Sequence, residues 1–147
     1  GEHVKKILDA LVTLYDFIIV DCGANYDDRT LTALENADDI MLVVTPEIGP
    51  LKNAVLFLDV ANKLGLSLDK VHVILNRANS NVGIEDKEIE RTLRRPVAYR
   101  VISGGRALVL SVNRGVPLVI AKPDHPLAQQ IYYIVDSFMA VLHKKAA

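Results

Sequence analysis

Small and polar residues directly follow four apolar runs of the sequence, and they are the residues best suited to ligand chemistry. Asp21 follows the first run, and its carboxylate is a hard oxygen ligand of the kind that Mg²⁺ prefers. Gly23 comes two residues later, and a residue without a side chain lets a backbone N–H approach a phosphate. The four groups are Asp21-Cys22-Gly23, Thr45-Pro46-Glu47, Asn76-Arg77 and Ser103-Gly104-Gly105.

The four apolar runs are themselves typical of buried β-strands. Phe17 to Val20 is apolar without interruption, which indicates a strand covered on both faces, as in a parallel sheet. Before, between and after these runs, apolar residues recur at helical spacing, as they do from Val4 to Tyr15. Strands that alternate with helices predict an α/β fold, with a parallel sheet, helices on both faces and functional residues at the strand ends. The predicted strands are Phe17–Val20, Ile40–Val44, Val71–Leu75 and Val97–Ile102, and the predicted helices are Val4–Tyr15, Leu31–Asn36, Pro50–Leu64, Ile84–Leu93, Ala107–Asn113 and Pro126–His143.

The composition favours a single domain over residues 1–147, because half of the residues are apolar and one core can be built from them. Lys and Arg total 17 against 18 Asp and Glu, so the net charge of −1 provides no broad field for nucleic acid or an anionic membrane. Cys22 is the single cysteine, the first residues lack the layout of a signal peptide, and no apolar run approaches the roughly 20 residues of a membrane span. These observations predict a cytoplasmic protein without membrane insertion.

The first predicted strand resembles a known motif. Tyr15 to Asp21 is similar to the Walker B strand of the ParA/MinD-type P-loop ATPases, in which the final Asp holds Mg²⁺ through water. Around Asp27–Leu34 and Pro46–Asn53 the sequence most resembles the CpaE/TadZ branch, whose members are pilus-assembly and polar-localisation ATPases, often fused to a response-regulator-like receiver domain. The resemblance covers essentially the whole chain in the family's order. Its further segments are Leu34–Ile40, Thr45-Pro46-Glu47, Asn76-Arg77 and Asn113–Pro117.

The resemblance implies roles for individual residues. Asp21 would hold Mg²⁺ through water once nucleotide is bound, and Gly23 would lie near the phosphates. Asn76 occupies the position of the family's adenine-contacting Asn, although an Asn at a strand end also stabilises a turn by itself. Arg77 would be a solvated or stacking neighbour. For the complete protein, the resemblance implies ATP and Mg²⁺ as cofactors, a homodimer, pilus or polarity proteins as partners, and a place at the cell pole.

The motif that grips phosphates is absent from these residues. P-loop ATPases need Gly-x-x-x-x-Gly-Lys-Ser/Thr, whereas the single pair of adjacent glycines, Gly104-Gly105, is followed by Arg106. In the family this Walker A loop precedes the Walker B strand, and the chain starts at Gly1 without Met. We therefore expect the C-terminal portion of a longer domain, an incomplete P-loop fold. This chain alone is predicted to have no catalytic residue, no ATP hydrolysis and no tightly bound nucleotide.

Two loops depart from the family pattern. The family often has Pro soon after the Walker B Asp, and usually has Pro in the loop over adenine. Neither Asp21 to Ala24 nor Ile102 to Arg106 contains a Pro. The departures predict a changed γ-phosphate switch and a reduced affinity for adenine.

Two other functions stay open. The same fold could be a scaffold that binds pilus or polarity proteins without hydrolysis. A receiver-like phosphoacceptor domain is disfavoured, because the acidic pair and the lysine that receivers use are absent. In the P-loop fold, the phosphate-loop strand lies beside the Walker B strand. Without it, the sheet is expected to be open beside Phe17–Val20 and to be closed by re-pairing, by dimerisation or by a further segment.

Overall fold

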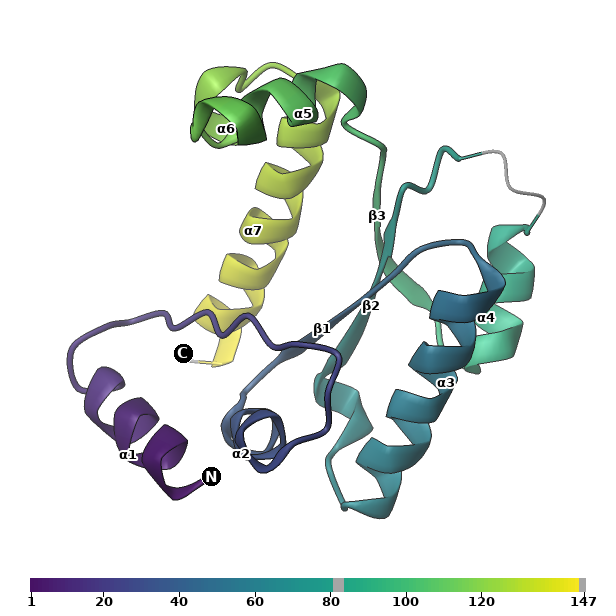
Figure 1. Cartoon of the computed structure of the whole chain (residues 1–147). Helices are drawn as coiled ribbons and strands as arrows, with labels where there is room; N and C mark the ends of the chain where they lie inside the picture. The colour runs from purple at the N-terminus through teal and green to yellow at the C-terminus, as the bar shows by residue number, and fades with distance from the viewer. Residues whose placement is uncertain (81–83, 146–147) are drawn as a thin grey trace.

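Three parallel strands form the sheet at the centre of the chain (Figure 1). The computed structural model describes residues 1–80 and 84–145. The strands β1 (Ile40–Val44), β2 (Val71–Asn76) and β3 (Val97–Val101) lie in the order β1-β2-β3. β1 pairs with β2 without interruption, whereas the pairing of β2 with β3 is irregular between Val73 and Ile74. Among the described residues, β1 therefore has a strand along only one of its edges.

Helices cover both faces of this sheet (Figure 1). α3 and α4 cover one face, where Leu75 and Ile89 are fully buried, each 0% exposed. α7 covers the other face, where Ile74 packs with Leu127 and Ile134. The helices are α1 (Glu2–Leu11), α2 (Asp28–Asn36), α3 (Ile48–Lys63), the 3₁₀ helix η1 (Leu68–Lys70), α4 (Asp86–Leu93), α5 (Gly105–Arg114), α6 (Leu118–Ala121) and α7 (Pro126–Lys145).

The long helix α3 illustrates how local sequence sets the ends of an element. Pro50 lies in its first turn, where the missing N–H of the ring removes no helical hydrogen bond. Gly65 follows the helix with a φ of 73°, in the left-handed region that favours glycine. The next residue, Leu66, donates its N–H to the carbonyl oxygen of Ala61 at 3.0 Å. This cap turns the chain toward β2, as the position of Gly65 predicts.

The predicted α/β architecture is confirmed, with a parallel sheet and helices on both of its faces. Every predicted helix is present, although α1 ends at Leu11 rather than Tyr15. The short helix α6 was not predicted, because Leu118 to Ala121 is too short to display a helical period. Within residues 1–80 and 84–145, no helix is both long enough and apolar enough to cross a bilayer.

The prediction that Phe17 to Val20 forms an interior strand is wrong for the structure of this chain. The segment belongs to no strand, and Ile19 is 95% exposed. Phe17 and Val20 are exposed as well. A parallel strand exists only where neighbouring backbone satisfies its N–H and C=O groups, and no described strand pairs with this segment. The apolar pattern is that of a strand, but the neighbour that would make it one is not among the described residues.

Candidate functional site

The loop after β2 is held in shape by the side chain of Asn76. Its Oδ1 accepts a hydrogen bond from the backbone N–H of Arg77 at 2.9 Å. Arg77 has a φ of 56°, a left-handed conformation that is uncommon for a residue with a side chain. The N–H of Ser80 donates to the carbonyl oxygen of Arg77 at 2.8 Å, which closes the turn. Asn76 thus performs the turn-stabilising role that its residue type permits.

The loops after β2 and β3 are joined to each other by two hydrogen bonds. The N–H of Ala78 donates to the carbonyl oxygen of Val101 at 3.0 Å. The N–H of Ser103 donates to Oδ1 of Asn79 at 2.8 Å. These contacts unite two of the four polar groups that the sequence places at strand ends. They are the Asn76-Arg77 group and the Ser103-Gly104-Gly105 group.

A third contact joins the end of β3 to the final helix. The N–H of Ile102 donates to Oε1 of Gln130, a residue of α7, at 2.9 Å. Sequence reasoning missed both Asn79 and Gln130. In the sequence, Asn79 shows only the general pattern of an Asn-rich turn, and Gln130 is one polar residue within the predicted helix Pro126–His143. Neither signal says which backbone group the amide will reach.

Gly104 lies where the first turn of α5 meets α7. A Cβ atom at this position would lie 2.6 Å from Cβ of Leu108 and 2.6 Å from Cδ2 of Leu127. Such distances are far inside van der Waals contact, so a larger residue here would require Leu108 or Leu127 to shift. The loop at the end of β3 is therefore fixed by the packing of Gly104 against Leu127 of α7, and by hydrogen bonds from its backbone to Asn79 and Gln130.

The Asp21 group is placed very differently. Asp21, Cys22 and Gly23 are all exposed. Asp21 makes no hydrogen bond or ion pair with any described residue, and a Cβ atom at Gly23 would meet nothing within 4 Å. No hydrogen bond within residues 1–80 and 84–145 links this group to the loops of Asn76 or Ser103. The structure thus leaves the predicted magnesium-side residue without a fixed direction.

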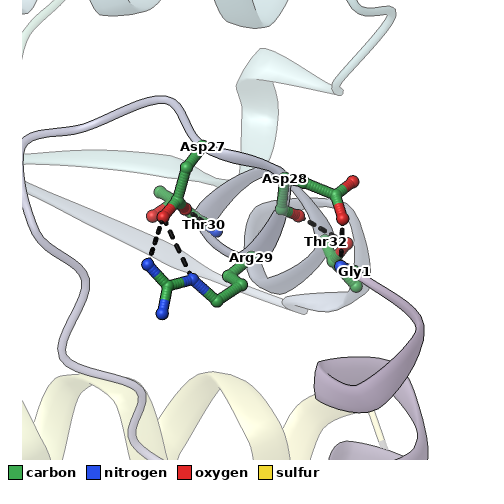
Figure 2. Close-up of polar contacts among 6 residues, drawn as sticks. All are labelled: Gly1, Asp27, Asp28, Arg29, Thr30 and Thr32. Carbon is green, nitrogen blue, oxygen red and sulfur yellow. Dashed lines mark hydrogen bonds and ion pairs between the residues drawn. The ribbon is translucent and has the colours of Figure 1, made fainter.

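Asp27 and Arg29 form the polar contacts at the start of α2 (Figure 2). Oδ1 of Asp27 accepts the backbone N–H of Thr30 at 2.9 Å, which caps the helix. The guanidinium of Arg29 donates to Oδ2 of Asp27 from Nη2 at 2.7 Å. The Thr30 hydrogen bond, followed by that of Arg29, lowers the pKa of Asp27 from 3.8 to about 2. In the same helix, Asp28 pairs with the amino group of Gly1.

The Thr-Pro-Glu turn after β1 is also closed on itself. The hydroxyl of Thr45 donates to Oε2 of Glu47 at 2.9 Å, and the N–H of Glu47 donates to the carbonyl oxygen of Thr45 at 2.8 Å. Pro46 between them is buried. The turn therefore directs the chain from the sheet into α3, and its hydroxyl already has an acceptor.

The described residues do not by themselves assemble a metal site. No group of three or more His, Cys, Asp or Glu within them is placed to hold a metal ion. A single carboxylate such as Asp21 fits Mg²⁺ only in the outer shell, because Mg²⁺ keeps its waters and takes its direct ligands from phosphates. Among the described residues, Asp21 would therefore hold Mg²⁺ only through water.

Comparison with known proteins relates this arrangement to nucleotide-binding proteins. No protein-family profile matches the chain. An uncharacterized ATP-binding protein of Methanocaldococcus jannaschii is 34% identical over 144 residues, which cover 97% of this chain and 53% of that protein. A putative septum site-determining protein MinD of Guillardia theta is 29% identical over 126 residues, covering 82% of this chain and 46% of that protein.

The solved structures give the same result. The ParA family ATPase from Chlorobium tepidum superimposes with a TM-score of 0.83 at 29% identity, over 88% of this chain and 53% of that chain. The chain spans about half the length of the curated relatives it matches. Over the part that it covers, the chain is therefore similar in sequence and fold to proteins described as ParA family or MinD proteins.

Proposed function

We propose that this chain is the C-terminal part of a CpaE/TadZ-like ATPase that acts in pilus assembly or polar localisation. In this proposal residues 1–147 belong to one nucleotide-binding domain. Asp21 holds Mg²⁺ through water, Gly23 lies near the phosphates, and Asn76 and Arg77 border the adenine. The Walker A loop, which grips the phosphates, is supplied by residues outside this chain.

The observation that carries the proposal is the pair of joined loops at the ends of β2 and β3. Ligands of open α/β sheets bind outside the carboxyl ends of the strands, and these loops lie there. The hydrogen bond from the N–H of Ser103 to Oδ1 of Asn79 holds the two loops together. The similarity to a protein described as ATP-binding, which extends over 97% of this chain, supports a nucleotide as the ligand.

The open edge of β1 supports completion of the site by a further segment. Met41 is 50% exposed and Val43 is 57% exposed, although both belong to a strand of a parallel sheet. Strands of such sheets are normally covered on both faces and paired on both edges unless they are terminal. A strand placed between β1 and Phe17–Val20 would pair with the backbone groups on the open edge of β1 and give the Walker B-like segment its neighbour. Its loop would then lie between Thr45 and Asp21.

The narrower parts of the proposal rest on sequence patterns. The segments Asp27–Leu34 and Pro46–Asn53 are those that resemble the CpaE/TadZ branch. They support a cytoplasmic homodimer at the cell pole, with pilus or polarity proteins as partners and a receiver-like domain in the same polypeptide. Exposed apolar side chains on α7, such as Tyr133 at 68%, provide surface for such partners.

The second candidate is a scaffold of the same fold that binds its partners without hydrolysis. The observation that favours it is the state of Asp21, an exposed carboxylate with no partner among the described residues. In a scaffold this residue would only be solvated, and its replacement would change no binding.

The test is calorimetric titration of Mg-ATP into two proteins. One is this chain, and the other is the polypeptide that joins it to the residues encoded immediately upstream. We expect no micromolar binding by the chain alone and clear binding by the longer polypeptide. Asp21→Asn should weaken the Mg²⁺-dependent part of that binding, whereas Asp16→Asn, a matched exposed carboxylate, should leave it unchanged.

Two results would count against the proposal. If the longer polypeptide binds no Mg-ATP, or binds it equally well with Asp21→Asn, the scaffold is the better description. If the chain alone binds with micromolar affinity, the phosphates are held within these residues and the role given to the upstream segment is wrong.

A further inference from the structure

We infer that Lys70 is a positioning residue: it fixes the C-terminal end of α2 on the sheet, and through α2 it sets the place of the segment that carries Asp21. The inference rests on the proposed function, because it takes Asp21 as the residue on the magnesium side of the nucleotide. It assigns a role to a lysine that lies outside the motifs described above.

The end of α2 is closed by a side chain from a distant part of the chain. The last carbonyl groups of an α-helix have no partner within the helix and need one from elsewhere. Nζ of Lys70 donates to the carbonyl oxygen of Leu34 at 3.1 Å and to that of Ala37 at 2.9 Å. No backbone N–H of the described residues outside α2 donates to either oxygen. The half-buried ammonium group also lies at the negative end of the helix, where a cation is favourable.

A second polar contact lies beside the first, where β1 and β2 begin. Asp39 directly precedes β1, and Lys70 directly precedes β2. The two strands are paired from their first residues onward. Nε2 of His72, the second residue of β2, lies 2.8 Å from Oδ1 of Asp39. The chain between α2 and β1 is therefore held at both of its ends, by Lys70 at the helix and by His72 at the strand.

These polar contacts are important because little apolar surface holds α2. Within α2, all of which the structure describes, Ala33 is the single buried residue. By contrast, α3 buries five side chains in the core, those of Leu51, Ala54, Phe57, Leu58 and Ala61. Loss of the Lys70 ammonium group should therefore loosen α2 while the core beneath α3 stays intact.

Both ends of the segment that carries Asp21 are attached to α2 (Figure 1). α1 precedes this segment and packs against α2. The segment then enters α2 at Asp27, whose side chain caps the helix. Between the helices, residues 16–25 make no hydrogen bond with any other described residue, and Tyr26 stacks on Phe57 of α3 at 6.5 Å between ring centroids. A displacement of α2 would therefore move Asp21 relative to the sheet.

The anchoring is tested without nucleotide, by amide hydrogen exchange of this chain followed by NMR. In Lys70→Met, the amides of residues 34–36 should exchange about tenfold faster than in the unaltered chain, while those of Val73 and Leu75 keep their rates. Lys70→Arg keeps a cationic donor and should retain most of the protection. Lys63→Met, at an exposed position in the last turn of α3, is the control and should leave the exchange of α2 unchanged.

Two results would overturn the anchoring. Unchanged exchange of α2 in Lys70→Met would show that packing alone holds the helix. Equal acceleration of exchange in α2 and β2 would show that Lys70 supports the whole core and does not position α2 separately.

The effect on Asp21 is tested in the longer polypeptide, by titration with ATP in the presence and in the absence of Mg²⁺. Lys70→Met should reduce the gain in ATP affinity that Mg²⁺ provides by about fivefold and leave binding without Mg²⁺ unchanged, whereas Lys70→Arg should keep the gain. In an Asp21→Asn background, Lys70→Met should have no further effect, because the lysine acts through that carboxylate.

The outcomes separate this inference from the proposed function. Equal weakening of ATP binding with and without Mg²⁺, or a full effect of Lys70→Met in the Asp21→Asn background, would overturn the positioning role and spare the proposed function. Absence of Mg-ATP binding by the unaltered polypeptide would overturn the proposed function and the link to Asp21 together. The exchange experiment would still decide whether Lys70 anchors α2.

Discussion

The loops after β2 and β3 and the segment from Phe17 to Gly23 lie in contrasting states. The two loops are tied to each other through Asn79 and to α7 through Gln130. Phe17 to Gly23 has the apolar pattern of a buried strand followed by a ligand-type carboxylate, yet Ile19 is 95% exposed and Asp21 has no partner among the described residues. Both regions are predicted to serve one nucleotide site. Among the described residues, only the two loops are held by hydrogen bonds to other elements.

The difference follows from where the neighbouring strands are encoded. β2 and β3 pair with each other, so the loops at their ends find partners within this chain. Phe17–Val20 finds no strand to pair with in the described residues, and β1 presents an open edge. A local pattern therefore specifies that a segment can become a strand, whereas a neighbour decides whether it does. The two regions should therefore differ in amide protection and in their contribution to stability.

Hydrogen exchange should show the largest contrast. The amides of Val73, Ile74 and Leu75 lie in the central strand, under α3 on one face and α7 on the other. Their exchange requires opening of the core, so they should exchange at least about 10³-fold more slowly than unprotected amides. The amides of Ile18 and Ile19 should exchange at nearly the rate of an unfolded chain. Strong protection of both segments would mean that Phe17–Val20 has found a strand partner in solution, for example in a second copy.

Alanine substitution should measure the same contrast as stability. Leu75 is 0% exposed, and Leu75→Ala should lower the free energy of unfolding by about 2–5 kcal/mol. Ile19→Ala shortens a similar side chain at an exposed position, and it should change the free energy of unfolding by less than about 0.5 kcal/mol. Urea denaturation of the two variants provides the measurement. If Ile19→Ala costs as much as Leu75→Ala, Ile19 is buried in solution and the contrast disappears.

A pair of glycines compares the two candidate loops directly. Gly104→Ala would place a methyl group 2.6 Å from atoms of Leu108 and Leu127, and should cost about 1–3 kcal/mol. Gly23→Ala meets nothing within 4 Å, so it should be neutral to within about 0.5 kcal/mol. The same denaturation experiment reads both. A neutral Gly104→Ala would show that the start of α5 can move away from α7, which would also weaken the case for a fixed base-binding loop.

The sequence predicts much of the fold because its signals are local. The apolar runs Ile40–Val44, Val71–Leu75 and Val97–Ile102 and the helical periods between them became the strands and helices of the structure. The predicted end of the helix Pro50–Leu64 is confirmed within one residue, because the next residue, Gly65, adopts a left-handed φ that glycine tolerates on its own. The same kind of signal wrongly predicted a strand at Phe17–Val20. A continuous apolar run indicates that a segment favours burial, but it does not indicate which other segment will cover it.

The candidate site was less predictable, because it depends on contacts between distant residues. Asn76 and Arg77 were singled out by their position at a strand end, and the structure places them in the joined loops. Asn79 and Gln130 act across 24 and 28 residues of sequence, respectively, on backbone groups that carry no side-chain signal. Amide side chains at such positions become informative only when the strand register and the helix position are known.

The smallest effect is expected at Asp27, the N-cap of α2. The pKa of Asp27 is lowered from 3.8 to about 2, so the folded chain stabilises the ionised carboxylate relative to the unfolded chain. That stabilisation is fully present above pH 3.8 and is lost as the pH falls through about 2. In Asp27→Asn this part of the pH dependence should be missing, although the amide can still cap α2.

Measuring unfolding by urea between pH 5 and pH 2 tests this expectation. The difference in free energy of unfolding between the unaltered chain and Asp27→Asn should shrink toward the acid end. Asp16→Asn removes the same charge from a residue that caps no helix and is the control. Parallel pH curves for the unaltered chain and Asp27→Asn would mean that the hydrogen bonds from Thr30 and Arg29 to Asp27 do not persist in solution. The N-terminal cap of α2 would then not form at Asp27 in solution.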